Sequence, residues 1–199
     1  MYSEFFKRIF DFLFSLAVIL SLLLPLLVIV VLIKAESKGP LFFRQVRVGK
    51  GLKTFRVYKF RTMTNEKREV GTKPIIGKAE GVTQIGYYLR RFKIDELPQL
   101  LNILNGDMSI VGPRPSVPEQ LANMTDEEKM RYSVRPGLTG LAQINGNIHL
   151  QWKERFVYDL KYVKNITFIN DLKIVFRTVF IVLFGEEKYL NKPVTIKEH

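Results

Sequence analysis

The chain has 199 residues, with 31 Lys and Arg against 19 Asp and Glu, a formal net charge of +12 and no cysteine. The lack of cysteine excludes disulfides, thiolate nucleophiles and cysteine-ligated zinc, so chemistry has to come from carboxylates, hydroxyls, lysines or a bound metal. The positive charge indicates an anionic partner, which could be a nucleic acid, a phosphorylated metabolite or an acidic lipid surface. The length fits one domain with its own core, or one domain with a membrane element.

An uncharged apolar run extends from Phe12 to Ile33. As a helix it would be about 33 Å long, enough to cross the roughly 30 Å hydrocarbon core of a bilayer. Lys and Arg flank it on both sides, and the positive-inside rule pulls both ends toward the cytoplasm. Pro25 donates no hydrogen bond to the Ser21 carbonyl, so the helix breaks easily there. A re-entrant hairpin fits both facts, but so does a kinked single-pass helix, because spanning helices tolerate proline.

The segment from Val46 to Met63 predicts a β-hairpin with its turn at residues 49–52. Alternation along the second strand places Lys59 and Arg61 on one face, at the end of an apolar row. Two neighbouring cations could clamp a phosphate, although charges that protect an exposed edge strand would give the same pattern. Residues 64–83 are polar and without periodicity, so we expect a loop.

Two adjacent carboxylates, Asp95 and Glu96, follow a short helix predicted over residues 85–92. A second helix is expected from Asp95 to Leu104, with Asp95 or a neighbour as its N-cap and Gly106 just past its end. An aspartate in this place commonly only caps the helix, but a helix N-terminus also keeps a carboxylate ionised beside a phosphate. Adjacent side chains point about 100° apart, so the pair suits a nucleophile and a Mg²⁺ ligand better than a facing acid and base.

Two segments rich in glycine and proline each contain an arginine. Residues 106–118 predict a rigid turn that presents Arg114, whose guanidinium could bind phosphate oxygens at a low cost in entropy. A buried structural turn is the alternative. Residues 135–147, which begin at Arg135, predict a loop that lies close to a ligand or forms a tight packing corner.

The C-terminal part of the chain is expected to be helical. Thr125 and Glu128 have the spacing of a capping box. Residues 166–184 are too charged to cross a bilayer comfortably and too apolar for water, which predicts an interfacial helix or one packed on the N-terminal segment. An amphipathic face that we expect in the core is formed by Trp152, Phe156, Val157, Leu160 and Val163.

Four motifs in this order resemble those of the bacterial sugar transferases, specifically the small monotopic phosphoglycosyl transferases. They are YKFRTM at 58–63, DELPQL at 95–100, GDMSIVGPRP at 106–115 and RPGLTGLAQINGN at 135–147. The resemblance extends from the membrane segment to about Asp171. The chain departs from the family pattern at Leu24, where many members have Ser, and at Asn147, where many have Arg. Ser21 could bond the opened backbone in place of the missing Ser.

The resemblance implies transfer of a sugar 1-phosphate from a UDP-sugar donor to a polyprenol phosphate, usually undecaprenyl phosphate, with release of UMP. This reaction is the first membrane step of glycoconjugate assembly. Asp95 would be the nucleophile of a ping-pong reaction, and Glu96 would share a Mg²⁺ site with it. Arg90 and Arg114 match arginines that hold phosphate, and Lys59 lies in the matching YKFRTM motif. With these, Arg61 and Arg135 complete the phosphate-binding set that we predict.

The predicted fold is α+β and mainly helical. It comprises a re-entrant anchor over residues 1–35, a compact catalytic domain with a small β-hairpin over 36–165, interfacial helices over 166–190 and a polar tail over 191–199. Both termini would lie on the cytoplasmic face of the bacterial inner membrane, against anionic lipid, with downstream glycosyltransferases as further partners.

Two alternative hypotheses remain at this point. One is a membrane-bound phosphohydrolase that forms an aspartyl-phosphate, and the other is a basic membrane-associated binding module without catalysis. Nucleic acid is not expected as a partner, because the basic residues are scattered and no binding motif is recognisable.

Overall fold

The computed structural model describes residues 2–64, 81–185 and 188. The α-helices are α1 (Lys7–Ser21), α2 (Leu23–Glu36), α3 (Gln84–Arg91), α4 (Gln99–Asn105), α5 (Asp126–Lys129), α6 (Leu141–Ile144), α7 (Trp152–Lys164) and α8 (Phe168–Phe184). The strands are β1 (Phe42–Val48), β2 (Thr54–Phe60), β3 (Ser109–Val111) and β4 (Gly137–Thr139). There is also a π-helical turn, η1 (Tyr2–Phe6). The 3-10 turns are η2 (Lys50–Leu52), η3 (Ile94–Glu96), η4 (Pro118–Asn123), η5 (Met130–Ser133) and η6 (Asn147–His149). The predicted α+β, mainly helical class is confirmed.

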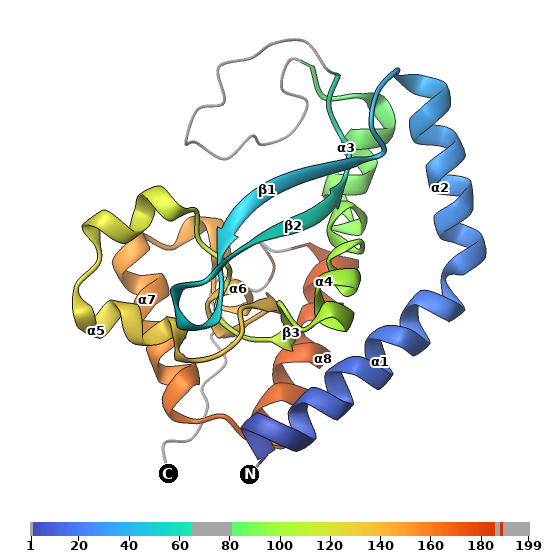
Figure 1. Ribbon diagram of the computed structural model, residues 1–199. Helices are drawn as coiled ribbons and strands as arrows, with labels where there is room; N and C mark the ends of the chain where they lie inside the picture. The colour runs from blue at the N-terminus through green and yellow to red at the C-terminus, as the bar shows by residue number, and fades with distance from the viewer. Residues whose placement is uncertain (1, 65–80, 186–187, 189–199) are drawn as a thin grey trace.

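Helices α1 and α2 form a bent arm along one side of the body (Figure 1). They meet at Leu22 with a bend of 65°, so the break predicted around Pro25 is confirmed. The Ser21 hydroxyl donates a hydrogen bond to the Val18 carbonyl over 3.0 Å beside this break. No single helix in the described part of the chain is long and apolar enough to cross a membrane, although the bent pair passes that test by length and composition.

Large apolar side chains are exposed along α1, α2 and α8. The most exposed include Leu24 at 73%, Val31 at 66% and Ile169 at 64%. Helix α8 packs on the body through the buried Ile174 and Ile181, and its Phe168 ring contacts Phe10 of α1 edge-on. One face of α8 is therefore core, and the opposite face extends the apolar surface of the arm.

Strands β1 and β2 pair antiparallel from Phe42 with Phe60 to Val48 with Thr54, so the predicted hairpin is confirmed. Most of the predicted loop, residues 65–80, lies outside the described residues, as does the predicted tail. Strands β3 and β4 form a short parallel pair, Ser109 with Gly137 and Val111 with Thr139, which the sequence did not indicate. The main core gathers around this pair, and its members include Ile103, Met108, Leu141 and Ile174.

The glycines of residues 106–118 and 135–147 let these segments approach each other. A Cβ atom added to Gly137 would lie 2.1 Å from the Gly112 nitrogen, far inside van der Waals contact. The packing corner, one of the two predicted roles for residues 135–147, is therefore confirmed. Part of that segment forms β4 and α6 instead of a loop.

The structure corrects one predicted face and confirms one cap. Trp152 is 50% exposed and Val157 is 66% exposed, whereas Phe156, Asp159 and Tyr162 are buried. Helix α7 is thus rotated from the expected orientation, because Asp159 and Tyr162 reach polar partners inside the core. The capping box of Thr125 and Glu128 is present, with both reciprocal hydrogen bonds.

Asp171 at the start of α8 joins three segments. Its carboxylate accepts hydrogen bonds from Lys7 Nζ at 2.6 Å, from the Tyr2 hydroxyl at 2.9 Å and from the Tyr162 hydroxyl at 2.7 Å. Lys7 and Asp171 are both buried. This cluster ties the base of the helical arm to α7 and α8.

Replacing Asp171 with Ala should destabilise the fold by about 3–5 kcal/mol, because it removes the carboxylate that pairs with a buried ammonium and accepts from two hydroxyls. Thermal unfolding in detergent measures the effect. Asp126→Ala is the matched control: its side chain is fully exposed, so its unfolding midpoint should hardly move. Equal midpoints for the two variants would contradict the proposed tie.

Candidate active site

The carboxylate pair lies in a 3-10 turn instead of at the start of an α-helix. Lys93 adopts a left-handed conformation with φ 56°, and η3 follows it directly. Helix α4 begins only at Gln99, with Pro98 at its N-cap and no side-chain cap. The prediction of Asp95 as N-cap is therefore wrong, because the left-handed residue turns the chain before the helix starts. Gly106 ends α4 with φ 91°, as predicted.

Glu96 is held by two cations. Lys59 Nζ lies 2.6 Å and Arg114 Nη2 lies 2.9 Å from the same oxygen, Oε1. The Glu96 side chain is only 12% exposed. Burial alone would raise the pKa of Glu96, but Arg114 and Lys59 outweigh it and hold the pKa well below its usual range. Glu96 is therefore a permanent anion at the centre of the site.

Asp95 is in a different state from its neighbour. It is 9% exposed, and no hydrogen bond between described residues ends on its carboxylate. Burial and the charge of Glu96 raise the pKa of Asp95 to about 6, against the opposing charges of Lys59, Arg90 and Arg114. At neutral pH the carboxylate is mostly ionised, yet it is more basic than an ordinary aspartate.

Arg90 completes the positive side of the site. Its Nε donates a hydrogen bond to the Thr62 hydroxyl over 2.8 Å, and its charge lowers the pKa of Asp95. The structure thus brings together Asp95, Glu96, Lys59, Arg90 and Arg114 from three distant stretches of sequence. Three cations around two carboxylates leave a net positive charge, which suits a phosphorylated ligand.

Arg114 is presented by a rigid loop, as predicted. Four consecutive carbonyls of this loop accept hydrogen bonds from four separate positions: Pro113 from Gly137, Arg114 from Arg131, Pro115 from Arg47 and Ser116 from Val48. The loop backbone is therefore held from several sides, and Arg114 keeps its position at a low cost in entropy.

The chain matches the family model of the bacterial sugar transferases over residues 2–185. It belongs to the bacterial sugar transferase family. It is 41% identical over 189 residues to the uncharacterized sugar transferase EpsL of Bacillus subtilis (strain 168), covering 95% of this chain and 93% of that protein.

Two further relatives carry names that describe an activity or a process. A UDP-glucose:undecaprenyl-phosphate glucose-1-phosphate transferase of Klebsiella pneumoniae is 42% identical over 193 residues, which are 92% of this chain but 41% of that protein. An exopolysaccharide production protein, PSS, of Rhizobium leguminosarum bv. phaseoli is 41% identical over 185 residues, 87% of this chain and 92% of that protein. The chain thus spans nearly the whole length of some relatives and less than half of others.

Two predicted phosphate-binding residues of this sugar transferase lie elsewhere. Arg61 is buried and donates hydrogen bonds to the Ile33 and Ser37 carbonyls at the end of α2. Its backbone N–H still bonds to the Leu41 carbonyl beyond the end of β2, but its guanidinium has other partners than the Lys59 ammonium, which is bonded to Glu96. Arg135 donates to the Gly106 carbonyl over 2.9 Å and lines a separate cavity without Asp95 or Glu96. Both guanidinium groups donate to backbone carbonyls instead of to the carboxylate pair, and their predicted binding of phosphate stays a prediction.

The support behind Arg114 was not predicted from the sequence. Arg131 donates to the Arg114 carbonyl and, over 2.6 Å, to Asp159, and the side chains of this ion pair are 3% and 2% exposed. The Arg131 guanidinium also lies 5.3 Å from the centre of the Tyr132 ring and 5.2 Å from that of Phe156. The only available signal was Asp159 itself, a charge at helical spacing between two aromatic residues.

The carboxylates of Asp95 and Glu96 in this sugar transferase suit a Mg²⁺ ion that also binds water and substrate oxygens. They are too few to hold a metal ion through protein side chains alone. Among the described residues no cluster of three or more His, Asp or Glu could bind a metal ion. Both cations on Glu96 use Oε1, so within the described part of the chain Oε2 has no hydrogen bond, and neither does the Asp95 carboxylate. Mg²⁺ in phosphate chemistry takes one or two carboxylates and completes its shell with water and substrate oxygens.

Proposed function

We propose that the chain transfers a sugar 1-phosphate from a UDP-sugar to undecaprenyl phosphate and releases UMP. Family membership and the names of relatives support this general reaction. The observation that carries it for this chain is the arrangement of Asp95 and Glu96. The buried Glu96 carboxylate is fixed between two cations, and the Asp95 carboxylate accepts no hydrogen bond from any residue that the structure describes. A nucleophile needs the second environment, and a charge-balancing anion fits the first.

The proposed reaction has two displacement steps. An Asp95 oxygen attacks the β-phosphorus of the donor, a bond from that oxygen to phosphorus forms, and the bond to the UMP oxygen breaks. An oxygen of undecaprenyl phosphate then attacks the same phosphorus, and the Asp95 carboxylate is released. Neither step requires a proton transfer, because both nucleophiles are anions. Lys59, Arg90 and Arg114 stabilise the negative charge on the phosphate oxygens.

We propose that Asp95 and Glu96 hold Mg²⁺ together with oxygens of the donor. The bound cation would supply neutralisation of the diphosphate charge, which otherwise repels an anionic nucleophile. Glu96 serves this role while it stays ionised, and its bonds to Lys59 and Arg114 keep it ionised.

We also propose that α1 and α2 form a re-entrant hairpin and that both termini face the cytoplasm of a bacterium, with the catalytic domain on the inner membrane. The 65° bend and the exposed apolar side chains of the arm support this topology, as do Lys and Arg on both flanks.

Cysteines placed in the flanks, at residue 4 and at residue 38, should react with an impermeant thiol reagent only after the cells are opened. Labelling of either position in intact spheroplasts would show a spanning helix.

Asp95→Asn should reduce UMP release by at least about 10³-fold, because an amide is a poor nucleophile. The assay uses detergent-solubilised protein with Mg²⁺ and a panel of UDP-sugars, with and without undecaprenyl phosphate. Without the lipid, the wild type should release about one equivalent of UMP and gain the mass of one phosphosugar. The variant should do neither.

Two outcomes of this assay would contradict the proposal. Turnover by Asp95→Asn would remove Asp95 as the nucleophile. Continuous release of free sugar phosphate by the wild type without lipid would indicate a phosphohydrolase instead. Glu127→Gln is the control: Glu127 is an exposed acid in α5, outside the site, and its loss should leave the rate unchanged.

Glu96→Ala should lower turnover by about 10²–10³-fold and raise the Mg²⁺ concentration needed for half-maximal rate. Chelation with EDTA should stop the wild-type reaction, and added Mg²⁺ should restore it. A wild-type rate that is unaffected by EDTA would refute the metal requirement. An unchanged Mg²⁺ dependence in Glu96→Ala would remove Glu96 from the metal site.

A further inference from the structure

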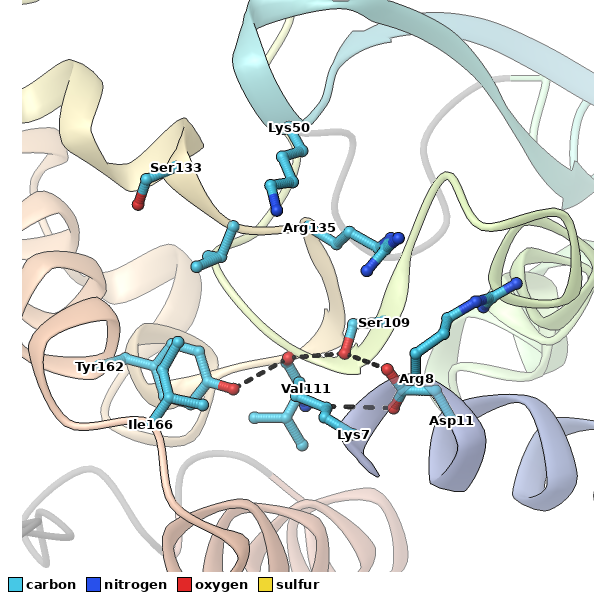
Figure 2. A pocket seen from close by; sticks show the side chains of 11 residues that line it. Lys7, Arg8, Asp11, Lys50, Ser109, Val111, Ser133, Arg135, Tyr162 and Ile166 are labelled. Atoms are coloured by element: carbon cyan, nitrogen blue, oxygen red, sulfur yellow. Dashed lines mark hydrogen bonds and ion pairs between the residues drawn. The ribbon is translucent and has the colours of Figure 1, made fainter. Parts of the chain in front are cut away.

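A cavity of about 70 Å³ lies beside the start of α1 (Figure 2). Its lining comes from α1, from the turn between β1 and β2, from β3, from the segment before β4 and from α7 with the loop after it. Neither Asp95 nor Glu96 lines it. Segments that are far apart in the sequence therefore enclose this cavity, with a set of side chains separate from the carboxylate pair.

The charges around this cavity are unbalanced. Its lining holds four cations, Lys7, Arg8, Lys50 and Arg135, and a single carboxylate, Asp11. Lys7 is paired with Asp171 over 2.6 Å. Asp11 accepts hydrogen bonds from the Ser109 hydroxyl and the Ile110 amide.

The other three cations have no such pairing. Within the described part of the chain, no carboxylate forms a salt bridge with Arg8, Lys50 or Arg135. Asp11 and Asp107 attract Arg8 from a distance, while Arg8 and Arg135 lie close enough to repel each other. This repulsion in a partly buried site would be relieved by an anion between them.

Neutral backbone groups hold the two guanidinium groups in place. Arg8 donates to the Ile103 and Leu104 carbonyls, and Arg135 donates through Nε to the Gly106 carbonyl. These carbonyls belong to the C-terminal end of α4, which carries a partial negative charge. Both Nη groups of Arg135 and Nε of Arg8 are left over from these bonds, so the donors are preorganised for a further acceptor.

The cavity also lies at the edge of the apolar surface. Ile9 and Phe10, the next residues after Arg8, are 43% and 38% exposed, and Phe168 at the start of α8 is 46% exposed. If this surface enters a bilayer, the cavity lies at the depth of the lipid headgroups. Basic pockets at that depth are suited to bind lipid phosphates.

We propose that this cavity binds a phosphate group, carried by a lipid headgroup or by a free phosphate ion, through Arg8, Lys50 and Arg135. All three line the cavity from separate segments, and Figure 2 shows the Lys50 ammonium pointing toward Arg135 while the Arg8 guanidinium extends toward the end of α4. The inference rests on the charge and geometry of the cavity and not on the transfer reaction, so a failure of either leaves the other standing.

Lys50→Gln tests the proposal with the least disturbance, since no hydrogen bond between described residues uses its side chain. The Kd of this cavity for inorganic phosphate should rise about fivefold, as expected for one cation worth about 1 kcal/mol. The readout is the increase in unfolding midpoint with phosphate, measured against chloride at equal ionic strength. Arg135→Gln should have the same effect, and Arg135→Lys a smaller one.

Lys53→Gln is the matched control, because Lys53 is an exposed lysine of the same turn that does not line the cavity. Phosphate that binds at the carboxylate site should raise the unfolding midpoint of all these variants by the same amount. Its effect therefore cancels when the variants are compared. In a second arm, each protein is released from nanodiscs of equal phosphatidylglycerol and phosphatidylcholine, and native mass spectrometry counts the retained lipid.

The two arms distinguish the source of the phosphate. Retention of phosphatidylglycerol by wild type and Lys53→Gln, and its loss in Lys50→Gln and Arg135→Gln, would identify a lipid headgroup. A phosphate-dependent stabilisation that is lost in the same two variants, without lipid retention, would identify a free phosphate. If Lys50→Gln and Arg135→Gln behave like Lys53→Gln in both arms, the proposal is overturned.

Discussion

The bonds of Lys59 and Arg114 to one oxygen of Glu96 are the interaction on which the site depends. They connect the end of β2, the turn before α4 and the loop after β3, in addition to the hydrogen bonds of Asn102 with β2 and the shared apolar core. The same bonds keep Glu96 charged although it is largely buried. A charged Glu96 beside a buried Asp95 then raises the pKa of Asp95, so one ion pair sets the state of both carboxylates.

Holding Lys59 and Arg114 against Glu96 costs conformational entropy unless the backbone around them is rigid. The protein supplies rigidity through hydrogen bonds to every carbonyl from Pro113 to Ser116 and through the buried pair of Arg131 and Asp159 behind them. The close contact of Gly112 with Gly137 adds a steric limit. Charged groups are thus used twice, once to form the site and once, deeper in the core, to hold the loop that presents it.

The helical arm is joined to the body by polar contacts at both of its ends. Asp171 accepts a hydrogen bond from Lys7 near the start of α1, and Arg61 donates hydrogen bonds to the Ile33 and Ser37 carbonyls at the end of α2. Between these points most side chains of the arm are apolar and exposed. Its inner face packs on the core through residues such as Val18, Ile19 and Ile33. These contacts and the buried hydrogen bonds set its position relative to the site, and its outer apolar face stays exposed.

The sequence by itself determined the apolar arm and its break, the β-hairpin, the Gly106 helix end and the capping box, because these depend on local composition and backbone chemistry. Motif resemblance, which is also local, singled out Asp95, Glu96, Lys59, Arg90 and Arg114. The tertiary structure alone decided which cations reach the carboxylates, since Arg61 and Arg135 have the same chemistry but are bound by nearby carbonyls. It also decided the parallel β3–β4 pair and the buried face of α7, because Asp159 and Tyr162 enter the core only when Arg131 and Asp171 are there to pair with them.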